Sequence, residues 1–340
     1  NGLMRRDLQT NEVTRVSKFK NVGKEKSILH SKLLYVDGRI VCVPFQTREI
    51  AIYDIKEAKM HFVDIPNIGG VRGSYFLQAH CKDGFVFLIP CRTSAVLKLN
   101  VKTLEVEIIY TIKDNGKYVW NRKEPFVYKA SELFEGKLYL AAFMEPFGVC
   151  IDLHTREAAY FSLPFKRGGS THLFKTKDGL FFVGQCGEIC KWGKNNIVKR
   201  IETNNELDLV MESGAIMNNT IYLFGSTSGK IYKINADDLH VEERQVIAQK
   251  GKKYLEEVWQ DFTGVSINQN GEIETFSTWS GQKLVIDPET LEVKDVIGSL
   301  KVRTSDLNEI VDDMFENNFI NEGVLLGLTD YLDYVKNKDV

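Results

Sequence analysis

Apolar and polar residues alternate along most of the chain, in short runs separated by polar turns. Apolar residues at every second position point to one face of an extended strand, and Asp, Asn, Thr and Glu between two such runs favour a tight turn. Each pair of runs therefore predicts an antiparallel hairpin. Hairpins of this kind recur at residues 5–16, 51–63, 96–109, 149–161, 189–201, 231–246 and 283–296. Recurrence roughly every 40 to 50 residues indicates a repeat architecture built from strands.

A second, longer hairpin precedes six of these seven units. Most of its turns carry Asp-Gly, Glu-Gly or Asn-Gly, which supply the positive φ of a two-residue hairpin turn. The second hairpins cover residues 31–45, 79–91, 130–143, 173–184, 214–225 and 264–277. Each repeat is therefore expected to hold four strands, a to d along the chain, in an all-β fold.

The repeat resembles the blade of a β-propeller, in which four-stranded meanders stand radially around a channel. The turn segments 286–293 (IDPETLEV) and 6–13 (RDLQTNEV) are similar to those of Tyr-Val-Thr-Asn and quinoprotein-type propeller repeats. The resemblance extends to about residue 300. It implies a fold and no single activity, since propellers include ligand binders, scaffolds, lactonases, lyases and oxidases.

The number of blades is open between six and seven, because residues 1–20 provide only a c–d hairpin. Either strands a and b of that blade precede Asn1, or the N-terminal pair closes or overlays a six-bladed ring. The complete meander that ends at Leu300 favours seven blades, with the first one incomplete at the N-terminus. We therefore expect a propeller domain over residues 1–300 and an extension over residues 301–340.

The alternation stops after Leu300. Asp306 and Glu309 match a helix-capping box and are followed by apolar residues at helical spacing. We expect a C-terminal helical extension that packs on the propeller or docks on a partner protein.

Binding residues are expected where the d–a and b–c loops emerge together, because loops on a rigid scaffold often carry function. Arginine binds carboxylate or phosphate through paired hydrogen bonds, and Trp and Tyr offer stacking surfaces. This pattern predicts an anionic peptide, glycan or nucleotide-sugar-like ligand, or a partner enzyme, held without catalysis. Alternatively, the arginines pair with surface carboxylates and the aromatic residues pack between blades. The predicted ligand-binding residues are Arg72, Tyr75, Arg92, Trp120, Arg122, Arg167, Trp259 and Trp279.

A metal-assisted hydrolase or lyase in the channel is the alternative function. His30 and His172 begin a strands, which line the channel of a propeller, and Glu212 and Asp261 could complete a site with them. The chain has no nucleophile-elbow, zinc-protease, P-loop or dinucleotide-binding motif, so no catalytic residue, metal or cofactor is assigned outside this alternative.

Charge and composition limit the kinds of partner that are expected. A net charge of −2 does not suit a nucleic-acid coat or an anionic-membrane binder, and no apolar run is long enough to span a membrane. The six cysteines are scattered at mostly apolar strand positions, which indicates reduced thiols and a cytoplasmic protein. A protein or peptide partner, or a small anionic ligand or glycan, is therefore expected.

Overall fold

The computed structural model describes residues 2–7, 10, 12–20, 29–68, 74–112, 127–166, 168–185, 187–192, 197–200, 211–225, 228–246, 262–277, 282–297 and 301–302. Every regular element in these residues is a β-strand. Within this part of the chain, no helix is long and apolar enough to cross a membrane. The strands belong to two compact units.

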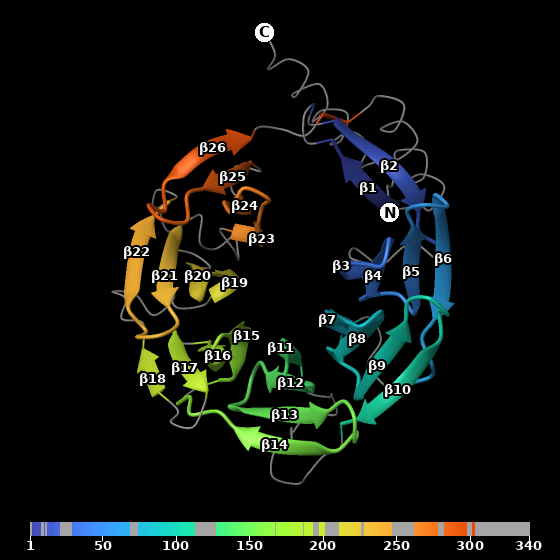
Figure 1. Cartoon of the computed structure of the whole chain (residues 1–340), viewed down its shortest axis with the longest axis horizontal. Coiled ribbons are helices and arrows are strands. Elements are labelled where there is room, and N and C mark those ends of the chain that lie inside the picture. The colour runs from blue at the N-terminus through green and yellow to red at the C-terminus, as the bar shows by residue number, and fades with distance from the viewer. Residues whose placement is uncertain are drawn as a thin grey trace, which may run out of the picture. The chain divides into compact units, whose positions relative to one another are not determined.

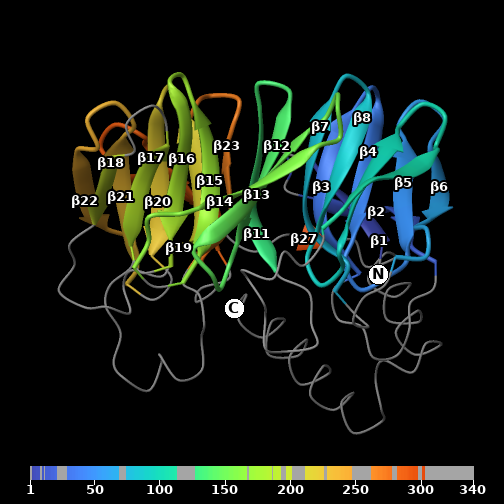
Figure 2. The ribbon, with the colours of Figure 1, turned by 90° about the horizontal axis from the view of Figure 1, so that it is seen from below.

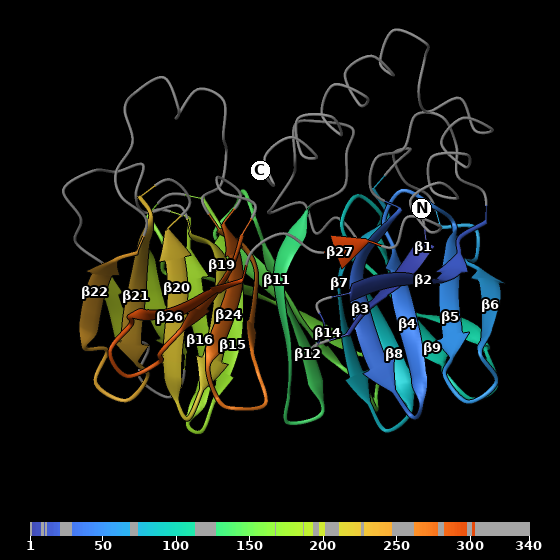
Figure 3. The ribbon, with the colours of Figure 1, turned by 90° about the horizontal axis from the view of Figure 1, so that it is seen from above.

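The first unit holds two sheets. One is a four-stranded antiparallel meander of β3 (His30–Val36), β4 (Arg39–Pro44), β5 (Glu49–Asp54) and β6 (Lys59–Asp64). The other joins the hairpin of β1 (Gly2–Arg6) and β2 (Glu12–Lys18) to the short strand β27 (Lys301–Val302). Strand β27 runs parallel to β2, so the two ends of the described chain share one sheet (Figure 3).

The second unit (Ile65–Ser299) holds five four-stranded antiparallel meanders, each with its strands in chain order (Figure 1). The first meander consists of β7 (Phe76–Lys82), β8 (Phe85–Pro90), β9 (Ala95–Asn100) and β10 (Val106–Thr111). The second consists of β11 (Tyr128–Phe134), β12 (Lys137–Ala142), β13 (Phe147–Asp152) and β14 (Ala158–Ser162). The third meander consists of β15 (Ser170–Thr176), β16 (Gly179–Gly184), β17 (Glu188–Trp192) and β18 (Ile197–Arg200). The fourth consists of β19 (Met211–Met217), β20 (Thr220–Gly225), β21 (Lys230–Asn235) and β22 (Val241–Gln245). The last is β23 (Phe262–Ile267), β24 (Ile273–Ser277), β25 (Lys283–Ile286) and β26 (Val293–Ile297).

The predicted hairpins are confirmed, but the preference for seven blades is not supported. The described residues form six four-stranded sheets and one three-stranded sheet. The N-terminal hairpin has β27 as its third strand, so it is not the second half of a four-stranded meander in this part of the chain. The predicted helix after Asp306 lies outside the described residues, and the domain boundary at residue 300 stays a prediction.

The turns between strands a and b explain why the hairpins form where the pattern placed them. In four of these turns both central residues have positive φ, from 48° to 78°, as a type I′ turn requires. Gly, Asn and Asp adopt this conformation at low cost. The four pairs are Asp37-Gly38, Asp83-Gly84, Glu135-Gly136 and Asn218-Asn219.

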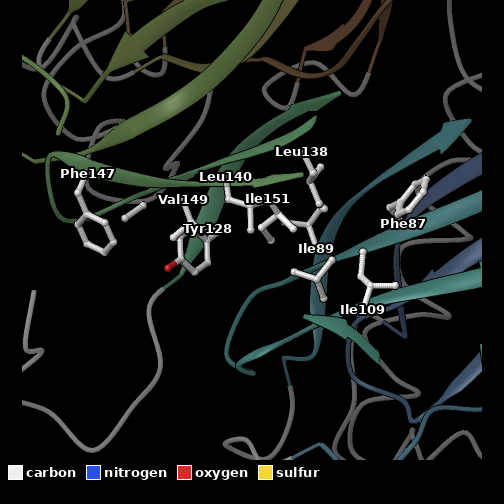
Figure 4. Close-up of a cluster of buried hydrophobic side chains, with 11 residues drawn as sticks. Phe87, Ile89, Ile109, Tyr128, Leu138, Leu140, Phe147, Val149 and Ile151 are labelled. Atoms are coloured by element: carbon white, nitrogen blue, oxygen red, sulfur yellow. The ribbon is translucent and has the colours of Figure 1, made fainter. Parts of the chain in front are cut away.

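The core of the second unit lies between adjacent blades. Each of its four blade junctions holds one cluster of buried apolar side chains. At the first junction, Phe87 and Ile89 of one blade pack against Leu138, Leu140 and other side chains of the next (Figure 4). The first strands β7, β11, β15, β19 and β23 contact one another in that order, which makes them the inner strands of this unit (Figure 1).

The described cysteines are free thiols, as the sequence predicts. Burial raises the pKa of Cys42 to about 12 and the pKa values of Cys91 and Cys190 to about 11. These three thiols therefore stay protonated at neutral pH. Cys81 is exposed, and Cys186 lies outside the described residues.

The turns between strands c and d share a side-chain motif. In three blades an aspartate Oδ1 accepts hydrogen bonds of 2.8–3.0 Å from the backbone N–H groups two and three positions later. The aspartates are Asp54, Asp152 and Asp287, and Asn100 has the same contacts in another blade. The side chain therefore satisfies donors that the tight turn leaves unpaired.

Acid is expected to destabilise these turns. Backbone hydrogen bonds are the main cause that lowers the pKa of Asp54, Asp152 and Asp287. The unfolded chain takes up protons at the ordinary aspartate pKa of about 3.9, so stability present above that pH is lost as the pH falls through the lower folded-state values.

A triple variant tests this pH dependence. Asp54→Asn, Asp152→Asn and Asp287→Asn together keep an accepting oxygen, as Asn100 does, and remove the titration. The variant should be less stable than the wild type at neutral pH, since Arg39 and Lys294 lose their ion pairs. Its melting temperature should nevertheless fall less than that of the wild type between about pH 6 and pH 3. Equal falls would contradict the assignment.

Candidate ligand-binding sites at the two ends of the blades

The b–c loop and the segment before strand a meet at one edge of the blade. In four blades a backbone N–H just after strand b donates to a carbonyl just before strand a, at 2.8–3.1 Å. The a–b turns of the second unit lie at the opposite edge, which is the upper edge in Figure 2. The predicted pairing of loops is therefore confirmed within these blades. The bonds are Phe45 N to Leu29 O, Cys91 N to Tyr75 O, Phe143 N to Val127 O and Gln185 N to Gly169 O.

Two predicted ligand-binding residues, Tyr75 and Arg92, are neighbours at this edge. Besides the Cys91–Tyr75 bond, Arg92 N donates to Ser74 O at 3.0 Å, so the two loops run side by side here. The Arg92 side chain is exposed and forms no ion pair with any described residue. Three other described arginines do: Arg39 contacts Asp54, Arg156 contacts Glu107 and Arg244 contacts Glu292, at 2.7–3.1 Å. Among the described residues, no carboxylate pairs with the Arg92 guanidinium.

The other predicted residues of this edge lie outside the described residues, and their grouping stays a prediction. They are Arg72, Trp120, Arg122, Arg167, Trp259 and Trp279.

The strand start at this edge has a repeated irregularity. The first strand of each of the six four-stranded blades shifts register within its first few residues, for example between Phe76 and Gln78 and between Ser170 and His172. A bulge of this kind bends the strand and changes the direction of a side chain at the end of a sheet.

The alternative catalytic residues fall in different parts of the structure. His30 begins β3 in the first unit, where its ring lies 4.3 Å from that of Phe19, centroid to centroid. Burial lowers the pKa of His30 to about 4, opposed in part by the Glu49 backbone, so the imidazole is neutral at pH 7. A neutral imidazole is a competent metal ligand, but a site needs converging partners.

His172 lies in β15 of the second unit. Its Nδ1 is 3.2 Å from Thr171 Oγ1, and its ring stacks on Phe174 at 5.7 Å with an interplanar angle of 7°. Glu212 is in β19 but its side chain is not described, and Asp261 lies outside the described residues. Within the part of the chain that the structure describes, no three His, Cys, Asp or Glu residues are placed to hold a metal ion.

A pocket that the sequence analysis missed lies at the other end of the inner strands. We call it the inner-strand pocket; its volume is about 440 Å³. Strands β7, β11 and β15 contribute His80, Glu132 and Lys175, each four positions before the glycine of its a–b turn. The remaining lining residues are Cys81, Lys82, Leu133, Glu135 and Gly136. The same position in the next two blades holds Ala215 and Ile267, so the charged chemistry belongs to three consecutive blades.

A hydrogen bond between two blades fixes the imidazole in this pocket. His80 Nε2 lies 2.8 Å from Ser131 Oγ, and His80 Nδ1 lies 3.8 Å from Glu132 Oε1. The same Glu132 oxygen accepts the Leu133 backbone N–H at 2.9 Å. Ser131 is 7% exposed, so it holds the ring in place and is poorly accessible as a nucleophile. The carboxylate and the imidazole are both held at the pocket wall.

Sequence reasoning overlooked this pocket because it treated each histidine singly and searched the loop edge. His80, Glu132 and Lys175 are separated along the chain, and no motif joins them. One pattern in the sequence could have revealed the pocket: in three successive repeats, a titratable residue lies at the same distance before the glycine of the a–b turn.

Comparison with known proteins supports the fold. No protein-family model matches the sequence, and no curated protein matches it. Among solved structures, the chain is similar to a streptogramin B lyase, with TM-score 0.60 and 11% identity over 80% of this chain and 85% of the other. It is similar to virginiamycin B lyase from Staphylococcus aureus, with TM-score 0.60 and 10% identity over 79% and 84%.

A third similar structure is the WD40 repeats of RRP9, with TM-score 0.57 and 10% identity over 81% of this chain and 82% of the other. At such identities the likeness shows the fold alone, since lyases and WD40 repeats share it. Together with the four-stranded meanders and the cores between blades, it shows that the chain has a β-propeller fold, with six four-stranded blades in its described residues.

Proposed function

We propose that this protein is a binding module that holds an anionic ligand, such as an acidic peptide, an anionic glycan or a nucleotide sugar, at the edge formed by the d–a and b–c loops. The observation that carries this proposal is the exposed Arg92 beside Tyr75, which forms no ion pair with any residue that the structure describes. A guanidinium binds carboxylate or phosphate through two parallel hydrogen bonds, and an adjacent aromatic ring adds a stacking surface.

The rest of the molecule is consistent with a local anion site. The net charge of −2 gives no general attraction for anions, so a binding site must be built from particular side chains. The similar solved structures include both lyases and WD40 repeats, so the fold is compatible with binding and with catalysis. The loop arginines outside the described residues would add to the same site if they gather around Arg92.

Titration calorimetry with Arg92→Ala tests the proposal. The probes are an acidic phosphopeptide, a sialylated oligosaccharide and a uridine diphosphate sugar. At least one should bind the wild-type protein, and the variant should bind it about tenfold more weakly or worse, since a charged hydrogen bond is worth about 1.5–3 kcal/mol.

Arg156→Ala is the matched control. Arg156 is also an exposed arginine, but it lies in a c–d turn, at the opposite edge of its blade, and contacts Glu107. Its removal changes the net charge equally and should leave binding unchanged. If none of the probes binds, or if both variants weaken binding to the same extent, the proposal is wrong.

A further inference from the structure

The inner-strand pocket is lined by charged side chains of both signs. Lys82 and Lys175 form no ion pair with any described residue, although Glu132 and Glu135 line the same pocket. Seven other lysines of the second unit each pair with a carboxylate, at Nζ–Oε or Nζ–Oδ distances of 2.6–3.5 Å. These lysines are Lys98, Lys177, Lys191, Lys230, Lys233, Lys283 and Lys294. The pocket thus holds two ammonium groups and two carboxylates, and one of these carboxylates, Glu132, also contacts His80 and the Leu133 N–H.

This charge arrangement selects the chemistry of the ligand. A simple anion would be attracted by Lys82 and Lys175 but repelled by Glu132 and Glu135, and a simple cation would meet the reverse. A molecule with one group of each sign can satisfy both pairs. A volume of about 440 Å³ lies near the small end of typical ligand pockets, which span about 300–1,000 Å³.

We propose that the inner-strand pocket binds a small zwitterion, an amino acid or a dipeptide. Its carboxylate pairs with the lysines of β7 and β15, and its ammonium group pairs with the glutamates of β11 and the turn that follows it. Leu133 provides an apolar wall for the side chain of the ligand. His80 is a positioning residue, because its bond to Ser131 holds it beside Glu132. The site is independent of the Arg92 edge.

Titration calorimetry with matched half-ligands tests the proposal. The probes are the standard amino acids and glycyl dipeptides. For each one that binds, the N-acetyl derivative lacks the ammonium group and the carboxamide lacks the carboxylate. The zwitterion should bind at least about tenfold more tightly than either derivative, because each derivative loses one of the two charged contacts.

Two variants assign the charges to their partners. Lys175→Met should abolish the preference for the free carboxylate over the carboxamide, and Glu132→Gln should abolish the preference for the free amine over the N-acetyl form. Lys137→Ala removes an exposed lysine that does not line the pocket, and should change nothing. Melting curves of all variants confirm folding.

The proposal is overturned if no zwitterion binds, if a half-ligand binds as tightly as its parent, or if Lys175→Met and Glu132→Gln leave the two preferences intact. A loss of phosphopeptide or nucleotide-sugar binding in Arg92→Ala does not test the inner-strand pocket. The proposals for the two sites can therefore be confirmed or refuted independently.

Discussion

Replacing Phe182 with alanine is expected to lower the free energy of unfolding by about 3–5 kcal/mol. Phe182 is fully buried in β16, and its ring lies 5.9 Å from that of Phe161 and 5.8 Å from that of Trp192, between centroids. Phe161 belongs to the preceding blade, so this ring is part of the junction between two blades. Removing it leaves a cavity that the rigid sheets on both sides cannot fill.

Urea unfolding of the variant beside Phe276→Ala measures this effect. Phe276 lies in β24 and is 36% exposed, so its truncation should cost clearly less than that of the fully buried Phe182. The difference between two Phe→Ala changes isolates the blade junction from the loss of an aromatic side chain as such. Equal losses of stability would show that the packed junction does not stabilise the fold as described.

Removing the carboxylate of Glu274 is the second change with a large expected effect. Lys283 is buried at 7% exposure, and its Nζ lies 2.6 Å from Glu274 Oε2. Glu274→Ala leaves that ammonium group without its partner, which should cost about 3 kcal/mol of unfolding free energy. This is at the low end of the range for buried pairs because Glu274 retains 24% side-chain exposure.

An exposed ion pair and a double variant serve as controls. Glu289 pairs with Lys233 at 3.0 Å but is 81% exposed, so Glu289→Ala should cost no more than about 1 kcal/mol. Replacing both Glu274 and Lys283 with methionine removes the unpaired charge and should recover much of the loss. A double variant as unstable as Glu274→Ala would argue against desolvation as the cause.

The strands were predictable because their signals are local. Alternation within each run and paired residues such as Asp37-Gly38 depend only on neighbours in the chain, and the structure has positive φ at both members of that pair. The preference for seven blades was not supported, because the number of blades depends on pairing between residues far apart in the chain. The pairing of Glu12 with Lys301 joins residues from the two ends of the described chain, and a two-residue strand carries no pattern that reveals its partner.

The two candidate sites differ in the same way, because one depends on contacts within a blade and the other on contacts between blades. Tyr75 and Arg92 could be predicted as neighbours, because they flank the first two strands of one blade and need only its meander to meet. His80 and Glu132 come together only when two blades pack through their inner strands. Side chains that meet between repeats are set by tertiary packing, so each repeat read separately does not reveal them.

The bond between His80 and Ser131 offers the most direct test of that packing. The two residues are 51 positions apart in sequence and belong to different blades. Nuclear magnetic resonance can follow the imidazole nitrogens of His80, assigned by their loss in His80→Gln. Ser131→Ala should shift the Nε2 resonance and change the tautomer balance of this histidine, while leaving those of His172 and His240 unchanged. An unaltered His80 spectrum in that variant would mean that the inner strands do not bring these blades together as described.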